Sequence, residues 1–403
     1  MKLVIRNNLF SRWIFLFIGV IIFLMKVFGI GGAGTVVALF IVITVVFDRK
    51  MLSRKNFDNV FGLYIFFCII SGAGYLINGK PILLFFQGIS YNLFPALVYL
   101  IGAKDAGERD GDAINRAFLG SMFVIVVGLL FYYLKPDYYY SHLGQSLDSF
   151  VWGLNDYRYG SFITSLNLGS LCVTSIGLWF STIRKRNILL NGVFAISILL
   201  SLFLSMQRSA WIASAICIIF IVLLSKLSKR RKFVIVSLTV LLFCFTLVGS
   251  ERIFTTAQID NFRNRLSYLT VEKMVSTRIS QWRIGIDTFF DYPFGAGLGT
   301  MGHKAAEAGF TEVVADGNYL RMLSEIGIIG FCTFLILIIR GVKNVFGKQM
   351  EILAVLIGFC LQAVGSNVFD LFYSSLFFWY LLGYANHYSS NLRQDDSTWR
   401  LIG

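Results

Sequence analysis

The chain has 403 residues, of which 56% are hydrophobic and 14% are charged, and its mean hydropathy is +0.71. A soluble protein of this length needs far more charge to coat its surface, so the composition excludes an ordinary soluble enzyme. The formal net charge of +14 comes mostly from basic residues between apolar runs, and it is therefore weak support for nucleic-acid binding.

Repeated apolar runs indicate a polytopic membrane protein. A helix needs about 20 apolar residues to cross a hydrocarbon core of ~30 Å. The first run begins at Trp13 and no small-residue cleavage site follows it, so we expect a retained helix rather than a removed signal peptide. Twelve spans are predicted, and in chain order they cover residues 13–29, 31–47, 59–77, 82–102, 115–134, 162–182, 188–205, 210–225, 233–249, 319–339, 350–366 and 369–388.

The segments between the predicted spans alternate in charge. Every second one is rich in Lys and Arg, and this set comprises the N-terminal MKLVIRNNLFSR, the connections DRKMLSRK, AKDAGERDGDAINRA, TIRKRN, SKLSKRRK and RGVKNVFGK, and the C-terminal tail. Because short loops rich in Lys and Arg stay in the cytoplasm, both termini are expected there. The fold class that follows is an all-α polytopic membrane protein with about 12 transmembrane helices.

Two segments on the opposite, outer face are long: residues 135–161, and residues 250–318 between spans nine and ten. We therefore expect one transmembrane domain over residues 1–403, with its chemistry or binding on the outer face. Apolar residues at helical spacing in VEKMVSTRISQWRIGIDTFF predict an amphipathic helix that lies on the membrane surface or caps the bundle. DYPFGAGLGT, residues 291–300, predicts a turn-rich segment whose backbone can approach a ligand closely.

A carrier is less favoured than an enzyme. The two halves of the sequence show no repeat, whereas many transporters are built from repeated halves. Ionisable residues near the middle of the predicted spans are also few, and an ion-coupled carrier usually has some.

Arginines on the outer face are the first candidates for binding. Arg208 separates two apolar runs in MQRSAWIASA. It is either an interfacial arginine that reaches the headgroups or a phosphate clamp, because guanidinium binds phosphate bidentately and stays charged. Arg158, Arg278 and Arg283 have the same two interpretations, and Arg265 lies in the same large loop. Several arginines near the membrane surface suit a lipid-linked diphosphate.

The end of the large outer loop carries the acidic candidates. Asp316 in ADGNYLRMLSEIGIIG is either a loop charge or helix cap, or a carboxylate that acts as a general base or orients an acceptor hydroxyl. Arg321 and Glu325 follow at i and i+4 on the next span, where they can form a self-satisfying ion pair near the interface.

No metal site is predicted. The histidines at 142, 303 and 387 are scattered, and neither HExxH nor a Cys/His cluster occurs. The motif DGD at 110–112 resembles an acidic metal-nucleotide motif, but it stands alone in a short cytoplasmic loop.

Several motifs follow one another over residues 155–335. An arginine between two spans is followed by a small residue and Trp in QRSAW, the long outer loop contains Arg278-x-x-x-Trp282 and PFGAGLG, and it ends in DGNYLRMLSEIGIIG. This order resembles the O-antigen ligase and polymerase superfamily of bacterial surface-polysaccharide assembly.

The resemblance implies a glycosyltransferase in the bacterial inner membrane that uses neither metal nor cofactor and acts on the periplasmic face. Its donor is a glycan on undecaprenyl diphosphate; the acceptor hydroxyl attacks the anomeric carbon and the lipid diphosphate leaves. Arg208 and Arg278 match the family's two important arginines, which stabilise the diphosphate charge, and Tyr319 and Glu325 match the closing motif. The implied partners are the lipid-linked oligosaccharide, membrane lipid, a chain-length regulator and a flippase.

One departure from the family pattern bears on which branch the chain resembles. Ligases carry a His-Asn pair ahead of the Tyr-Leu, whereas this sequence has Asp316-Gly317 there. The difference favours a polymerase, which moves a growing O-antigen or capsule glycan onto the next lipid-linked repeat unit, with Asp316 as the candidate that acts as acceptor base or orients the acceptor. The alternatives are a ligase that transfers glycan to lipid A-core, a flippase or other carrier, and a non-enzymatic assembly subunit whose arginines bind headgroups.

Overall fold

The computed structural model describes residues 9–48, 50–53, 56–72, 82–108, 110–144, 158–224, 237, 271–302, 305 and 317–388. Every regular element within these ranges is a helix, in agreement with the predicted all-α class. The description of the large outer loop is therefore confined to one helix, the segment directly after it and a few single residues.

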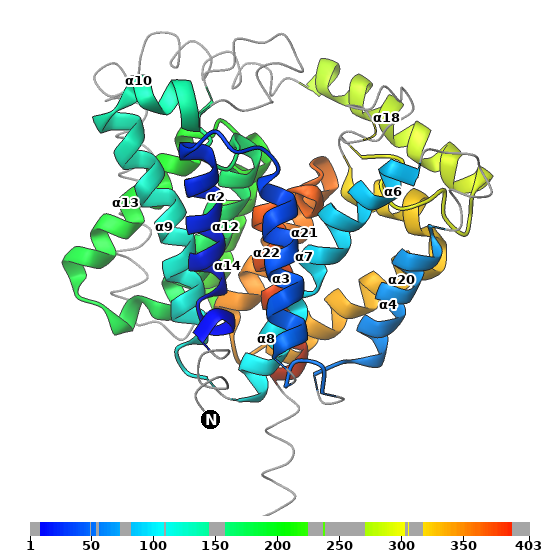
Figure 1. Cartoon of the computed structure of the whole chain (residues 1–403), viewed down its shortest axis with the longest axis horizontal. Coiled ribbons are helices and arrows are strands. Elements are labelled where there is room, and N and C mark those ends of the chain that lie inside the picture. Colours follow the sequence, from blue (N-terminus) through cyan, green and yellow to red (C-terminus); the bar gives the residue numbers. More distant parts are fainter. Residues whose placement is uncertain are drawn as a thin grey trace, which may run out of the picture.

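The first half of the described chain forms helices that run up and down between two ends of a bundle (Figure 1). They are α2 (Ile14–Val27), α3 (Ala33–Phe47), α4 (Asn59–Ile70), α6 (Ile82–Gly88), the π-helix η1 (Ile89–Leu93), α7 (Phe94–Ala96), α8 (Val98–Gly107), α9 (Ala113–Leu134), α10 (Pro136–Tyr138) and the π-helix η2 (Tyr139–Leu143).

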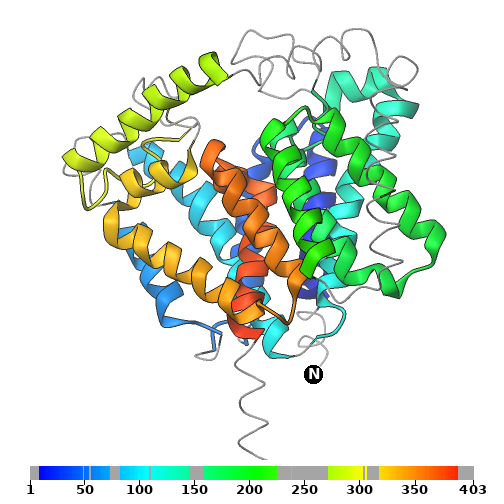
Figure 2. The ribbon, with the colours of Figure 1, turned by 180° about the vertical axis from the view of Figure 1, so that it is seen from behind.

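The second half continues this arrangement, and α20, α21 and α22 pack against one another in Figure 2. Its elements are α12 (Ser165–Thr182), the 3₁₀ turn η3 (Ile183–Lys185), α13 (Ile188–Leu204), α14 (Arg208–Leu224), α18 (Val271–Asp291), α20 (Asn318–Val345), α21 (Met350–Gly365), the 3₁₀ turn η4 (Val368–Asp370) and α22 (Phe372–Tyr388).

Helices occur at all the predicted spans that the structure describes, while the predicted span 233–249, apart from residue 237, lies outside the described residues. Within the described ranges, three helical stretches are long and apolar enough to cross a membrane, namely Leu84–Gly107 (from α6 to α8), Ala113–Leu134 and Asn318–Val345, and α2, α3, α4, α13, α14 and α21 are shorter apolar helices. These lengths and compositions are consistent with a helical membrane protein, and the count of twelve spans stays a prediction.

Different helices lie at the two ends of the bundle. The start of α2 and the end of α22 lie at one end, whereas α10 and α18 lie at the other (Figure 1). The described helices of the two long predicted outer segments therefore share one end, opposite the start of α2 and the end of α22. Which end faces the cytoplasm stays a prediction.

The central helix α22 is buried along almost its whole length. It packs closely on α8, because glycines on each helix face the backbone of the other. A side chain at Gly102 would collide with the carbonyl of Tyr380, and one at Gly383 would collide with the carbonyl of Tyr99. Small residues allow such close approach between membrane helices, and dispersion contacts then replace the hydrophobic driving force that lipid does not supply.

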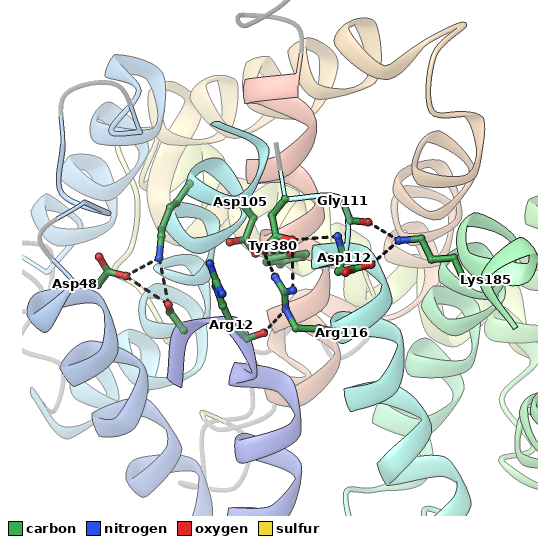
Figure 3. A network of polar contacts seen from close by, with 11 residues as sticks. Arg12, Asp48, Asp105, Gly111, Asp112, Arg116, Lys185 and Tyr380 are labelled. Carbon is green, nitrogen blue, oxygen red and sulfur yellow. Dashed lines mark hydrogen bonds and ion pairs between the residues drawn. The ribbon is translucent and has the colours of Figure 1, made fainter. Parts of the chain in front are cut away.

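A polar network ties helices together at the end that holds the start of α2 (Figure 3). The Lys104 ammonium lies 2.6 Å from an oxygen of Asp48, and both side chains are buried. Next to it, the Tyr380 hydroxyl donates to Asp105 at 2.8 Å. Removing one partner of a buried ion pair costs about 3–5 kcal/mol, so this network fixes α8 against α22 and the end of α3.

The DGD motif belongs to the same network. Asp110 pairs with Arg116, and Lys185 lies 2.7 Å from an Asp112 oxygen and also donates to the carbonyl of Gly111. Burial raises the pKa of Asp110, but the bonds from Arg116 and from the Asp112 N–H outweigh it and leave the pKa below its ordinary value. Asp112 thus joins η3 to the turn before α9, and Asp110 holds the same turn on α9, which gives the motif a structural role.

Candidate functional site

The structure brings together two turns that carry outer arginines. The backbone N–H of Tyr159 donates to the carbonyl of Leu204 at 3.1 Å, so the segment that begins at Arg158 lies against the turn between α13 and α14. Arg208 is the first residue of α14. Both arginine side chains are half-buried.

These turns contain strained backbone. Ser161 and Met206 each have a φ of +52°, a left-handed conformation that side chains with a Cβ seldom adopt. Such strain persists only where the surroundings impose it, and it concentrates at functional sites. The Gly160 N–H also donates to the Tyr139 hydroxyl at 3.3 Å, which joins the first turn to η2.

The start of α14 is held in place by the rest of the QRSAW motif. The Trp211 indole N–H donates to the carbonyl of Leu202 at 2.9 Å, and the ring stacks on Phe203. The Ser209 hydroxyl lies 3.0 Å from the hydroxyl of Ser366 after α21. The small residue and the Trp of the motif therefore position the helix end on which Arg208 stands.

Electrostatics make this helix end suitable for an anion. The amino end of a helix carries a partial positive charge and unpaired N–H groups. An arginine at this end adds charge of the same sign, an arrangement that a bound phosphate stabilises.

The other predicted diphosphate ligands are placed only in part. Arg283 on α18 is exposed, and its Nε lies 3.8 Å from an Asp287 oxygen one turn further on. Arg278 belongs to α18, but its side chain lies outside the described residues, as do Arg265 and Asp316. The structure therefore tests neither their roles nor their distance from Arg208.

A charged cluster lies inside the bundle near the start of α20. Arg321 and Glu325 form the expected i,i+4 pair at 2.9 Å, but both are 1% exposed, so the pair is buried rather than interfacial. Arg321 Nη2 also lies 2.5 Å from Asp370 Oδ1 and donates to Asn92 Oδ1 at 3.0 Å. One arginine thus joins α20, η1 and η4.

Asp370 and Asn92 were not among the sequence candidates. Asp370 is an acidic residue at the start of the last apolar run, and an ionisable residue within a span is itself a signal of a polar centre. Nothing in the sequence links Asn92 to the cluster, because its place depends on how η1 packs in the bundle.

The start of α20 is anchored by two further side chains. The Tyr319 hydroxyl donates to the carbonyl of Cys360 on α21 at 2.8 Å. The side-chain oxygen of Asn318 accepts a bond from the N–H of Phe369 on η4 at 2.8 Å. Tyr319 therefore serves a structural contact, and the residue two positions before Asn318, Asp316, precedes a fixed helix end.

The glycine-rich segment approaches a helix backbone rather than a free surface. The chain of α20 is broken at Gly327, which has a φ of +70° and a ψ of 176°. The N–H groups of Ala296 and Gly297 donate to the carbonyls of Ser324 and Glu325, and the N–H of Ile328 donates to the carbonyl of Pro293. The backbone of this segment thus lies close to that of α20, whereas its approach to a ligand stays a prediction.

Glu325 connects this segment with the charged cluster. Its Oε1 accepts a bond from the Met301 N–H at 3.0 Å, while its Oε2 receives Arg321. No group of three or more His, Cys, Asp and Glu side chains suited to a metal occurs in the part of the chain that the structure describes.

A comparison with known protein families identifies one segment of the chain. Residues 193–335 match the family described as O-Antigen ligase. This segment therefore carries the family's domain, which supports the resemblance to the O-antigen ligase and polymerase superfamily. The match supports a ligase- or polymerase-type membrane enzyme, and it spans from α13 to the first part of α20. A comparison with curated proteins gives no match.

The matched segment includes the most important candidates. Arg208, Arg278 and Asp316 lie within it, as do Arg321 and Glu325. Arg158 and Asp370 lie outside it, and the structure alone connects them to the matched residues.

Proposed function

We propose that the chain is a polysaccharide polymerase. It transfers a growing glycan from undecaprenyl diphosphate onto the next lipid-linked repeat unit on the periplasmic face of the inner membrane. The acceptor hydroxyl oxygen forms a bond to the anomeric carbon of the donor, and the bond from that carbon to the diphosphate oxygen breaks. The diphosphate leaves with the electron pair, and Asp316 takes the proton from the hydroxyl.

The observation that carries the proposal is the contact between the turns of Arg158 and Arg208. It places two half-buried arginines on adjoining turns at the bundle end that also holds α10 and α18. A leaving diphosphate develops negative charge, and fixed guanidinium groups stabilise that charge without a metal. Arg278, and Arg283 beside it on α18, are the proposed further ligands of the same diphosphate.

Asp316 is the proposed base because of its position in the chain. It stands just before the helix start that Asn318 and Tyr319 anchor to η4 and α21. A carboxylate at that point can be held in one place relative to the bundle, as a general base requires. If Asp316→Ala retained full transfer activity at normal expression, this role would be wrong.

A ligase is the second candidate, because the description of the matching family names that activity. The two candidates share the donor and differ in the acceptor, which for the ligase is lipid A-core. Asp316-Gly317 in place of a His-Asn pair favours the polymerase. A flippase remains the third candidate.

Deletion of the gene separates these candidates. We expect lipid A-core that carries one repeat unit and no ladder on a lipopolysaccharide gel. Long polymer on undecaprenyl diphosphate with bare lipid A-core would instead identify the ligase. Single lipid-linked units that accumulate on the inner leaflet would identify the carrier.

A further inference from the structure

The depth of the glycine-rich segment in the membrane follows from its position along helices α4 and α20. They pack against each other in opposite directions, with Gly330 next to Phe67 and Phe334 next to Tyr64. At one end Asp58 and Arg340 form an ion pair, and both stand beside predicted cytoplasmic connections. This pair therefore marks the inner boundary of the hydrocarbon core.

The glycine-rich segment contacts both helices at the same height. Gly327 lies 13 residues from Arg340 (340 − 327), and Ser71 lies 13 residues from Asp58 (71 − 58). At 1.5 Å per residue, each distance is about 20 Å. The N–H of Ile328, next to Gly327, donates to the Pro293 carbonyl, and the Leu298 N–H donates to the Ser71 hydroxyl.

This height lies within the membrane. A hydrocarbon core is about 30 Å thick, so a segment about 20 Å above the inner boundary is about 10 Å below the outer one. Tilt of the two helices shortens their rise along the membrane normal and places the segment deeper still. Residues 293–298 are therefore at hydrocarbon depth, although they lie in the loop between two predicted spans.

The backbone of the segment is suited to this depth. Irregular backbone is tolerated in hydrocarbon only where protein satisfies its polar groups. The N–H groups of residues 295 to 298 donate in turn to Tyr292, Ser324, Glu325 and Ser71, and the Met301 N–H donates to the Glu325 carboxylate. The break at Gly327 exposes the carbonyls of α20 that receive two of these bonds.

The exposed side chains of this region are apolar. Phe290 is 74% exposed and Phe294 is 77% exposed, and Ile328 and Ile329 on the adjoining turn of α20 are also exposed. A patch of this kind is unfavourable in water. It continues directly into the exposed apolar side chains further along α20, which face lipid in a membrane helix.

We propose that residues 290–299 form a re-entrant segment in the outer leaflet, with Phe290 and Phe294 in contact with lipid hydrocarbon. The end of α18 enters the membrane with them. The proposal does not depend on the glycan reaction, since it concerns only depth and lipid contact.

Spin labels test the proposal. Nitroxides are attached through Phe290→Cys, Phe294→Cys and, as a matched control on the same helix, Asp287→Cys, each in a full-length chain whose native cysteines are replaced by Ala. The labelled proteins are reconstituted into phosphatidylcholine liposomes, and power saturation compares collisions with oxygen, which concentrates in hydrocarbon, and with a water-soluble nickel chelate.

We expect collisions with oxygen to dominate at positions 290 and 294 and collisions with the nickel chelate to dominate at 287. The ratio of oxygen to nickel collisions should differ several-fold between the two phenylalanine positions and position 287. Nickel access at 290 and 294 equal to that at 287 would overturn the proposal. Spin–spin coupling that grows with the protein-to-lipid ratio would also overturn it, because a second copy would then cover the patch. The labels at positions 290 and 294 report membrane depth independently. If one of the two variants fails to fold, the other still tests the proposal.

Discussion

Arg321 on α20 lies 2.5 Å from Asp370 on η4 (Nη2 to Oδ1), and neither side chain reaches the surface to any large extent. The same guanidinium bonds Glu325 and Asn92. Glu325 in turn holds the N–H of Met301. One buried cation therefore connects the last helices, the first half of the bundle and the glycine-rich segment.

Removal of this cation should destabilise the protein strongly. Arg321→Leu leaves two carboxylates buried without their positive partner, which costs about 3–5 kcal/mol. We expect a clear drop in the midpoint of thermal unfolding in detergent. Arg283→Ala is the control, because it removes an exposed ion pair with Asp287 worth at most about 1 kcal/mol. Equal midpoints for the two variants would contradict the structural role of the cluster.

The break in α20 requires glycine. Gly327→Ala places a Cβ in a left-handed backbone conformation, which costs about 1–2 kcal/mol, and the new methyl group meets the backbone of Phe294. We expect lower thermal stability and loss of activity, because the glycine-rich segment can no longer dock.

Gly192→Ala on α13 is the matched control, since nothing lies within 4 Å of its Cβ position. There alanine improves helix propensity by up to about 1 kcal/mol. A stable, active Gly327→Ala variant would show that the break is dispensable.

The proposed diphosphate clamp predicts a graded response at Arg208. Arg208→Ala should lower the rate of glycan transfer by about 10²–10³-fold, as removal of one stabilising donor does in other sites. Arg208→Lys should fall between this variant and the wild type, because lysine keeps the charge but loses the bidentate geometry.

The assay follows transfer from a lipid-linked donor by purified protein. Lys185→Ala, at the opposite end of the bundle, is the control for general loss of folding. Wild-type rates in Arg208→Ala would exclude the clamp.

Charge stabilisation by arginine also predicts that activity does not require a metal. Prolonged dialysis against EDTA should leave the transfer rate of the purified protein unchanged within about twofold, because guanidinium groups supply the positive charge. If the transfer rate fell and the addition of Mg²⁺ or Mn²⁺ restored it, a metal cation would be shown to stabilise the diphosphate together with Arg208.

Much of the fold follows from the sequence. Apolar runs such as residues 115–134 become helices because only helices satisfy their backbone within lipid, and α9 spans Ala113–Leu134. The third predicted span is described only in part. Its residues 73–77 lie outside the described residues, while α4 ends at Ile70 and the contact with Leu298 follows at Ser71.

The candidate site was harder to predict than the helices. The pair of Arg321 and Glu325 follows from helical spacing, but its burial depends on Asp370 and Asn92, which are far away in the chain. The contact between the turns of Arg158 and Arg208 is likewise a backbone bond between distant segments. Such contacts arise from packing, and a local sequence pattern does not encode them.

The most direct test of the central claim is reconstitution of the purified protein in liposomes with the lipid-linked repeat unit as the only glycan. We predict glycans of two and more repeats on undecaprenyl diphosphate, with one undecaprenyl diphosphate released for each bond formed. A lack of elongation, together with glycan transfer once lipid A-core is added, would contradict the polymerase and identify a ligase.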